Sequence, residues 1–340
     1  MQPRSRDRQQ VGGSNVASCV TRRDFIATTA AASAGVAGLL VNGHTRAANS
    51  RAAVVDTHMH VWANNPKRYP FPHPYKRGFT TDDVPHEATV EMLIKDMNQH
   101  HCTHAVLVQV IYHGWDNAYV LDCAKRYPAR FKAHGLIDPR DPQVADKLQY
   151  WMDRGLHGMR FSPIYYQNGQ HGGDGWLDAP ETHRVWNVAE RTGARFNFFI
   201  APAQLSKLAK LVQAHPEVKI TLDHLSQMNL GVDPEPQMKQ LLSMAKYPNV
   251  FVKVSELTSV SKSGTYPFND AYPYVERVYQ AFGPDRLLFG TGYPGAARAA
   301  YKRPTLDKEV DLISNMPFLS ASDREKLLGL NAMELWGFDA

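Results

Sequence analysis

The chain has 340 residues, 43% of them hydrophobic, and a formal net charge of +5. This composition is typical of a soluble globular protein with a large core, and the length fits two average domains or one α/β barrel. Residues 1–47 carry six arginines and two aspartates, and therefore hold +4 of the net charge. The remainder is nearly neutral and has no stripe of Lys or Arg, which argues against a nucleic-acid partner.

The first 47 residues resemble a bacterial export signal. A basic lead is followed by the pair Arg22-Arg23, an uncharged Ala-rich run over residues 27–41, and the small-residue sequence Thr45-Arg46-Ala47. These features in this order are typical of a twin-arginine signal peptide. We therefore expect residues 1–47 to be removed on export and the mature protein to be periplasmic or secreted, with no membrane anchor. A disordered cytoplasmic tail is the alternative.

From residue 53 onward, short β-rich apolar runs alternate with segments of helical periodicity, which is typical of parallel strands joined by helices. Eight such units predict a single-domain α/β protein, a (β/α)8 TIM barrel over residues 52–340. A doubly wound open sheet is the alternative, but its first strand would usually precede a glycine-rich turn, and here that strand ends in histidines. The expected strands are Val54–His60, His104–Val110, Phe131–Asp138, Gly158–Ser162, Ala194–Ala201, Lys219–Leu225, Val250–Glu256 and Arg286–Thr291. The expected helices lie near 87–100, 116–127, 141–154, 181–192, 203–214, 235–246, 270–282 and 305–315.

Two of the expected connections, Val61–Thr80 and Pro163–Pro180, are much longer than a turn. Both follow the carboxyl ends of strands, where barrel enzymes assemble their active sites. The first is aromatic and rich in proline, and it suits a pocket wall with Trp62 as a substrate contact. The second is rich in glycine and carries Tyr165, which suits a mobile lid that contacts the substrate. Surface excursions without a function are the alternative.

Histidines mark the ends of two expected strands. His58 and His60 are two residues apart, so they point to the same face of the first strand, with Asp56 one layer deeper. Two such imidazoles can bind one divalent metal, and packed core histidines are the alternative. His224 ends the sixth strand and could be a third ligand, a proton donor or a group that polarises a carbonyl. By strand alternation, we expect Asp223 to face the other way and to have a structural role.

Several segments together resemble the amidohydrolase-related family, also called amidohydrolase 2, from about residue 53 to the end of the chain. The resemblance implies a TIM barrel that hydrolyses or decarboxylates a small oxygenated, often carboxylated, substrate, with or without a zinc-like metal. The family includes lactonases and decarboxylases of aromatic acids. The segments are Val55–Trp62, Gly135–Pro139, Gly158–Arg160, Leu222–Leu225, Asn249–Lys253 and Asp285–Gly290.

The chain departs from this family pattern at the end of the eighth strand. Family members usually have an Asp there, as a metal ligand or as the base that activates water, but here the position is Gly292. A metal-binding His is also missing from the fifth strand, which contains Phe196–Ile200, as in many lactonase members. We hypothesise that Glu256, at the end of the seventh strand, replaces the missing carboxylate as catalytic base. A solvated or salt-bridged rim residue is the alternative.

Basic side chains on other strands are candidates for binding a substrate carboxylate. Arg160 ends the fourth strand and can form a bidentate pair with a carboxylate. Lys253 lies in the seventh strand, and Arg298 follows the eighth. Structural ion pairs are the competing role. Cys102 and Cys123 are expected to be free buried thiols, with a disulfide between them as the alternative.

These observations predict a hydrolase that opens a lactone or a similar small carboxylated ester. His58 and His60 would hold a divalent metal, with zinc as the first candidate, and His224 and Glu256 would be the catalytic pair. A metal-independent lactonase, a metal-dependent decarboxylase of an aromatic or unsaturated acid, and a periplasmic binding protein without catalysis are the alternatives. A small-molecule substrate is the expected partner, and a homo-oligomer is left open.

Overall fold

The computed structural model describes residues 53–84, 86–292 and 295–339. The expected signal peptide over residues 1–47 lies outside these residues and stays a prediction. Within the described part of the chain, no helix is both long enough and apolar enough to span a membrane.

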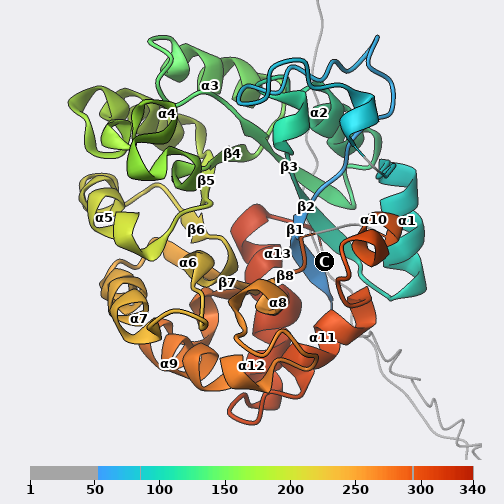
Figure 1. Ribbon diagram of the computed structural model, residues 1–340, viewed down its shortest axis with the longest axis vertical. Helices are drawn as coiled ribbons and strands as arrows, with labels where there is room; N and C mark the ends of the chain where they lie inside the picture. The colour runs from blue at the N-terminus through green and yellow to red at the C-terminus, as the bar shows by residue number, and fades with distance from the viewer. Residues whose placement is uncertain (1–52, 85, 293–294, 340) are drawn as a thin grey trace, which may run out of the picture. The chain divides into compact units, whose positions relative to one another are not determined.

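Eight parallel strands form one sheet in which every strand pairs with its neighbours in the sequence. The sheet curls into a nearly closed barrel in which β1 contacts β8, and the main-chain N–H of Gly292, just after β8, donates to the carbonyl of His58 in β1 (2.7 Å). The TIM barrel and its eight strands are therefore confirmed (Figure 1). Every strand ends sooner than the sequence indicates. The strands are β1 Val55–Met59, β2 His104–Val108, β3 Phe131–Leu136, β4 Gly158–Phe161, β5 Arg195–Phe198, β6 Ile220–Leu222, β7 Val250–Ser255 and β8 Leu287–Gly290.

Long helices surround the strands, as Figure 1 shows, and each covers the barrel with one apolar face. In α5, for example, Leu205, Leu208 and Leu211 are buried at the spacing of one helical face. Gly193 ends α4 in the left-handed conformation (φ +69°), as the glycine stop in the sequence predicts. The helices are α1 Val90–Gln99, α2 Ala118–Arg126, α3 Val144–Asp153, α4 His183–Thr192, α5 Leu205–Ala214, α7 Pro234–Ser243, α9 Tyr272–Phe282 and α11 Leu306–Ser314.

Shorter helical segments fill the connections. The α-helical ones are α6 His224–Gln227, α8 Leu257–Val260, α10 Gly295–Ala300, α12 Ala321–Glu325 and α13 Asn331–Trp336. The 3-10 turns are η1 Thr81–Asp83, η2 Ile111–His113, η3 Pro163–Gly172, η4 Gly175–Asp178, η5 Pro180–Thr182, η6 Pro202–Gln204, η7 Met244–Lys246, η8 Asn269–Ala271 and η9 Pro284–Arg286, and η10 Lys326–Leu330 is a π-helical turn.

Helix α13 covers the end of the barrel at which the strands begin (Figure 1). Trp336 packs in one apolar cluster with Val55 of β1 and Leu288 of β8, and its indole N–H donates to Nε2 of His134 in β3 (2.8 Å). Apart from His134, the side chains that pack around Trp336 at this end are apolar, and His58, Asp223 and Arg160 lie toward the opposite end. That end, where the strands finish, is the mouth of the barrel.

Cys102 and Cys123, the two cysteines among the described residues, are free buried thiols, as expected. Burial raises the pKa of both thiols, that of Cys123 to about 11. Neither thiol is therefore a nucleophile at neutral pH.

Candidate active site

Two imidazoles of β1 meet at the mouth of the barrel, as the His-x-His spacing predicts. The Nε2 atoms of His58 and His60 are 3.3 Å apart. The Nδ1–H of His60 donates to the carbonyl of Val108 in β2 (2.7 Å), so Nε2 is the nitrogen that keeps its lone pair. His58 is fully buried, and it is the innermost of these side chains.

Asp56 lies one layer deeper, as expected, but both oxygens of its carboxylate accept hydrogen bonds from residues of the barrel wall. Oδ1 accepts from the main-chain N–H groups of His58 (2.9 Å) and Thr291 (3.1 Å), and Oδ2 accepts from the hydroxyl of Thr291 (2.6 Å). These bonds fasten β1 to the residue that follows β8. Asp56 therefore positions His58 from behind and is not arranged as a ligand at the mouth.

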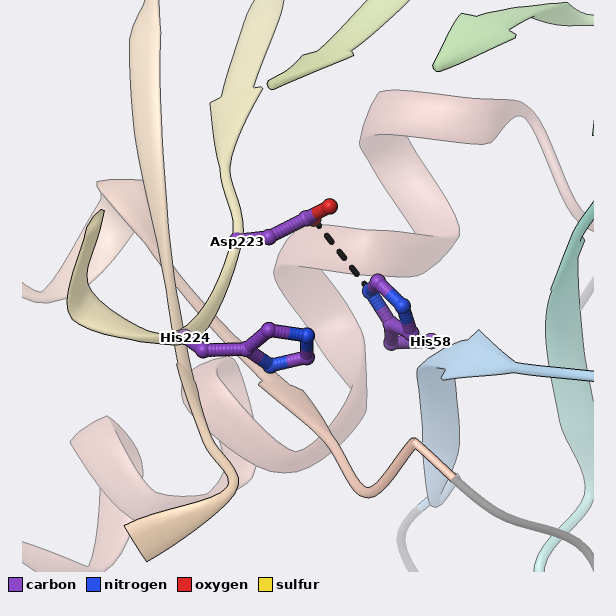
Figure 2. Close-up of side chains that lie close together, drawn as sticks. All are labelled: His58, Asp223 and His224. Atoms are coloured by element: carbon purple, nitrogen blue, oxygen red, sulfur yellow. Dashed lines mark hydrogen bonds and ion pairs between the residues drawn. The ribbon is translucent and has the colours of Figure 1, made fainter. Parts of the chain in front are cut away.

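The expectation that Asp223 faces away from the mouth is wrong. Its Oδ1 lies 3.2 Å from Nδ1 of His58, as Figure 2 shows, and 3.0 Å from Nζ of Lys253. In β6 it is Leu222 that packs in the apolar cluster with the outer helices, whereas Thr221 faces the barrel interior and bonds to Asn197 of β5. By alternation, Asp223 then shares the interior face with Thr221.

His224 reaches the mouth because the backbone leaves the strand conformation. Its φ is +53°, and the next three residues also have positive φ. This left-handed turn swings the imidazole inward beside Asp223, where its ring centroid is 4.4 Å from that of His58 (Figure 2). Four consecutive non-glycine residues in this region are costly, and such strain is typical of functional sites.

Asp223 is the centre of a buried charge cluster. Besides Lys253, it pairs through Oδ2 with Nε of Arg160 in β4 (3.1 Å). Burial alone would raise the pKa of this carboxyl, but Lys253, His58 and Arg160 hold the pKa well below its usual range. Lys253 is fully buried, so its ammonium group holds Asp223 and His58 in place from inside the barrel. A direct contact between Lys253 and a substrate stays a prediction that this placement does not support.

Glu256 lies beside His224, as the hypothesis of a displaced carboxylate requires. Its Oε1 is 3.4 Å from Nε2 of His224, and its Oε2 is 3.1 Å from Nη2 of Arg303 and 3.3 Å from the hydroxyl of Ser259. Burial would raise the pKa of Glu256, but the neighbouring His224 and Arg303 make the net change a lowering. The side chain is 12% exposed, so it can reach a molecule in the mouth.

The three imidazoles of the site are held in the neutral state. Burial lowers the pKa of His58 well below its usual value, that of His60 to about 3, and that of His224. Neutral imidazole is the form that binds metal ions and that can both donate and accept a proton. His224 also bonds through Nδ1 to the hydroxyl of Ser255 (2.8 Å), which fixes the plane of its ring.

The donor set fits a divalent metal. Two nitrogens that bind one tetrahedral zinc at 2.0–2.1 Å are separated by about 3.3 Å, and the two Nε2 atoms of His58 and His60 have this separation. Among the described residues, ligand atoms of His58, Asp223 and His224 also lie within 4.8 Å of one another. Asp223 is the poorest donor of these residues, because Lys253 and Arg160 already neutralise its charge.

The other side chains expected to contact substrate lie in different places. Tyr165 lines a hollow at the mouth together with Arg160. Trp62 is 2% exposed, donates its indole N–H to the carbonyl of His86 (2.7 Å), and lines a separate hollow that contains none of the site histidines. Arg298 is buried behind the wall, where its Nη2 donates to the hydroxyl of Thr291. Substrate contacts by Trp62 and Arg298 stay predictions that their placement does not support.

Two functional neighbours were missed from the sequence. Asp223 could have been found from Thr221, a polar residue among apolar ones that marks the interior face of β6. Arg303 had no such signal, because it reaches Glu256 from a segment 47 residues further along the chain.

The fold and this site define a TIM-barrel amidohydrolase. A family model described as amidohydrolase matches residues 55–338, so the chain belongs to the amidohydrolase family. The chain is 25% identical to an L-fucono-1,5-lactonase of Burkholderia ambifaria over 199 residues, which cover 58% of this chain and 66% of that protein.

Two solved structures are similar in fold. One is a probable 2-pyrone-4,6-dicarboxylic acid hydrolase of Acinetobacter baumannii with bound citric acid, with a TM-score of 0.68, 21% identity and coverage of 84% of this chain and 99% of that one. The other is an amidohydrolase of Burkholderia multivorans with bound zinc, with a TM-score of 0.68, 20% identity and coverage of 85% and 100%. At these identities the two structures show the fold alone.

Proposed function

We propose that the protein is a lactonase that hydrolyses a small carboxylated lactone or ester at the mouth of the barrel. The observation that carries this proposal is the convergence of three neutral imidazoles with one carboxylate, Glu256, which lies 3.4 Å from His224. The similarity to an L-fucono-1,5-lactonase supports the reaction class. Lactone hydrolysis needs a base for the attacking water and an acid for the departing oxygen, and this pair offers both.

Glu256 is the base in this mechanism. Its carboxylate takes a proton from a water molecule as the water oxygen bonds to the lactone carbonyl carbon. The bond from that carbon to the ring oxygen then breaks while Nε2–H of the neutral His224 hydrogen-bonds to the departing oxygen. Glu256 returns to that oxygen the proton that it took from water, so that one water is consumed and a hydroxy acid is formed. Because a carboxylate only accepts, Oε1 of Glu256 at 3.4 Å favours the tautomer of His224 that carries the proton on Nε2.

His58 and His60 would hold the metal. A divalent cation bound there supplies Lewis-acid polarisation of the lactone carbonyl. Both residues meet this role through Nε2 when the Nδ1–H of His58 donates to Asp223 and the Nδ1–H of His60 donates to Val108. Two lone pairs then face each other across 3.3 Å, an arrangement that favours a cation between them.

A metal-independent lactonase would use the tautomer of His58 that carries its proton on Nε2. The ammonium group of Lys253 lies 3.3 Å from Nδ1 of His58 and can donate to it. His58 would then carry its proton on Nε2 and donate it to His60. The two tautomers give opposite expectations for metal binding, so metal analysis separates the two mechanisms.

The proposal is tested with the purified protein and a panel of lactones and esters, with acid release followed by a pH indicator. We expect Glu256→Gln to lower kcat by about 100-fold or more, while the melting temperature stays within a few degrees of the parent. Ser259→Ala, which removes only a hydroxyl that bonds to Glu256, should keep most of the activity. Full activity of Glu256→Gln would refute the assignment of the base.

The same panel tests the alternatives. Thermal stabilisation by lactones with no turnover of any of them would favour a binding protein. Release of carbon dioxide from aromatic acids would favour a decarboxylase.

A further inference from the structure

A hollow opens at the end of the barrel where the strands begin, beside α13. Its volume is about 390 Å³, which is the size of pockets that hold small molecules. None of the described residues that line it belongs to the candidate active site. The side chains that line it include Arg195, Lys219, Phe251, Arg286 and Glu334.

Strand alternation explains why basic side chains meet in this hollow. Asn197 of β5 and Thr221 of β6 face the barrel interior, where they bond to each other (2.6 Å). Arg195 and Lys219 precede them by two residues, so both face the interior one layer nearer to the strand starts. The two are neighbours across the sheet, because the main-chain N–H of Phe196 donates to the carbonyl of Lys219 (3.0 Å).

The next two strands add a ring and a third cation. Lys253 of β7 lies inside the barrel, so Phe251, two residues earlier, belongs to the same lowest layer. Leu288 of β8 packs in one apolar cluster with Trp336, and Arg286 precedes it by two residues. The starts of four neighbouring strands thus contribute two guanidinium groups, one ammonium group and one ring.

The two arginines are half-buried and have no carboxylate partner within the described part of the chain. Burial lowers the pKa of Arg195 and of Arg286, and no neighbouring acid opposes this change. Main-chain carbonyls hold both groups in place. Nε of Arg195 donates to the carbonyl of Leu335 in α13. Nε of Arg286 donates to that of Phe282 (2.9 Å). Two fixed, partly desolvated cations without a counter-ion favour the binding of an anion.

Two acidic side chains also line the hollow, but neither pairs with these cations. Asp285 forms an ion pair with Lys326 (2.7 Å) and is 74% exposed. Glu334 of α13 and Lys219 are both exposed, and neither forms a salt bridge with any residue that the structure describes. The hollow therefore offers three positive groups to a ligand, with Glu334 as an acceptor at its edge.

We propose that this hollow is a second binding site, which takes the phosphate group of a small molecule. A phosphate group carries close to two negative charges at neutral pH and presents three acceptor oxygens. These oxygens match the guanidinium groups of Arg195 and Arg286 and the ammonium group of Lys219. The volume leaves room for a short hydroxylated chain, which contacts the ring of Phe251 and donates to Glu334. Because the hollow lies away from the mouth, this inference is independent of the lactonase proposal.

The test measures binding to the purified protein by titration calorimetry at constant ionic strength, with three ligands. Inorganic phosphate is the bare anion, glycerol 3-phosphate is a hydroxylated monoester, and succinate is a dianion without phosphate. We expect a Kd of about 1 mM or below for glycerol 3-phosphate, and a Kd about tenfold or more higher for succinate. An equal Kd for inorganic phosphate would assign the hollow to the free ion. Binding of neither phosphate compound, or tighter binding of succinate, would overturn the inference.

Three variants locate the bound phosphate. Lys219→Gln changes an exposed side chain and should raise the Kd for glycerol 3-phosphate about threefold or more. Arg195→Gln should raise it about tenfold or more, with folding checked by the melting temperature. Lys239→Gln makes the matched change at an exposed lysine of α7 and should keep the Kd of the parent. A parental Kd in both Lys219→Gln and Arg195→Gln would show that the phosphate binds elsewhere, and the inference would fail.

Discussion

The Oε1 atom of Glu256 lies 2.5 Å from the point where a Cβ atom on Gly292 would be. The carboxylate of Glu256 in its present position and a side chain at position 292 therefore exclude each other, so a Cβ atom there would displace the end of the glutamate side chain. In the family pattern the carboxylate follows the eighth strand, and here the space that it would need is filled from the neighbouring strand. This placement is what the hypothesis of a displaced carboxylate requires, with the negative charge at the end of β7 and none at position 292.

Gly292→Ala should lower kcat about tenfold or more, because the added methyl group displaces the carboxylate of Glu256. The φ of Gly292 is +105°, a conformation that side chains rarely adopt, so the variant should also lose about 1–3 kcal/mol of folding stability. Steady-state kinetics and urea unfolding measure the two effects.

Gly193→Ala is the matched control for this variant. Gly193 also has positive φ (+69°), but a Cβ atom there meets nothing within 4 Å. It should lose about 1 kcal/mol of stability and keep the kcat of the parent. In addition, Gly292→Ala should cost less stability in a Glu256→Gly background, since the clash is gone. Parental kcat in the single Gly292→Ala variant would contradict the mutual exclusion.

Arg303→Gln should move the acidic limb of the pH profile of kcat to higher pH. Glu256 must be ionised to accept a proton, so activity falls as pH drops through its pKa. Burial raises this pKa, and His224 and Arg303 lower it by more. Loss of the guanidinium group therefore raises the pKa, by about one unit for a close partner.

Arg277→Gln provides the comparison for Arg303→Gln. Arg277 of α9 pairs with Glu235 of α7 at the surface, so its loss removes a salt bridge of the same kind. Its pH profile should overlay that of the parent. A profile of Arg303→Gln that merely falls in height, with the limb in place, would show that Arg303 has a structural role and does not tune Glu256.

The barrel could be predicted from the sequence because its pattern is local. Each strand is a short apolar run and each helix ends at a residue that stops it, as Gly193 does at the end of α4. The contact of β1 with β8, which closes the barrel, follows once there are eight units. The exact ends of the strands could not be predicted, since polar residues such as Asp223 continue the extended pattern after the ladder has ended at Leu222.

The site could be predicted only where side-chain direction follows strand alternation. The rule holds for His58 and His60, which share one face of β1. The rule fails at β6. If His224 points into the barrel, strand alternation makes Asp223 point outward, but the left-handed turn at His224 brings both side chains inside. No local rule in the sequence reports such a turn at a residue other than glycine. Trp62 was likewise predicted to contact substrate because it lies in a loop at the end of a strand. Its indole is instead buried, and its N–H donates to the carbonyl of His86.

Metal analysis of the purified protein should find about one divalent cation per chain, and His60→Ala should lose it. The affinity should fall by more than the roughly 10–100-fold seen when only an outer partner of a ligand is lost. Chelator treatment of the parent should abolish lactone hydrolysis, and added zinc should restore it. His183→Ala, on the outer helix α4, should keep both metal and activity. Full activity after complete removal of metal would instead identify the tautomer in which Lys253 donates to His58.

Glu309 of α11 makes stability depend on pH. It is 3% exposed, and burial raises its pKa to about 8, with Arg298 opposing the change and Asp56 adding to it. Between the ordinary value of 4.5 and about 8, the folded protein keeps this proton and the unfolded chain does not. The free energy of unfolding therefore falls as pH rises through this window, by up to about 1.4 kcal/mol per pH unit from this group.

Glu309→Gln keeps the shape of the protonated side chain and removes its titration. The variant should thus become more stable relative to the parent as pH rises from 5 to 8, when urea unfolding is measured at each pH. Glu217→Gln, at an exposed glutamate, should show a difference from the parent that is nearly independent of pH. If the stability difference between Glu309→Gln and the parent were equally flat, the buried carboxyl would have to be ionised in the folded protein, with Arg298 as the group that stabilises its charge.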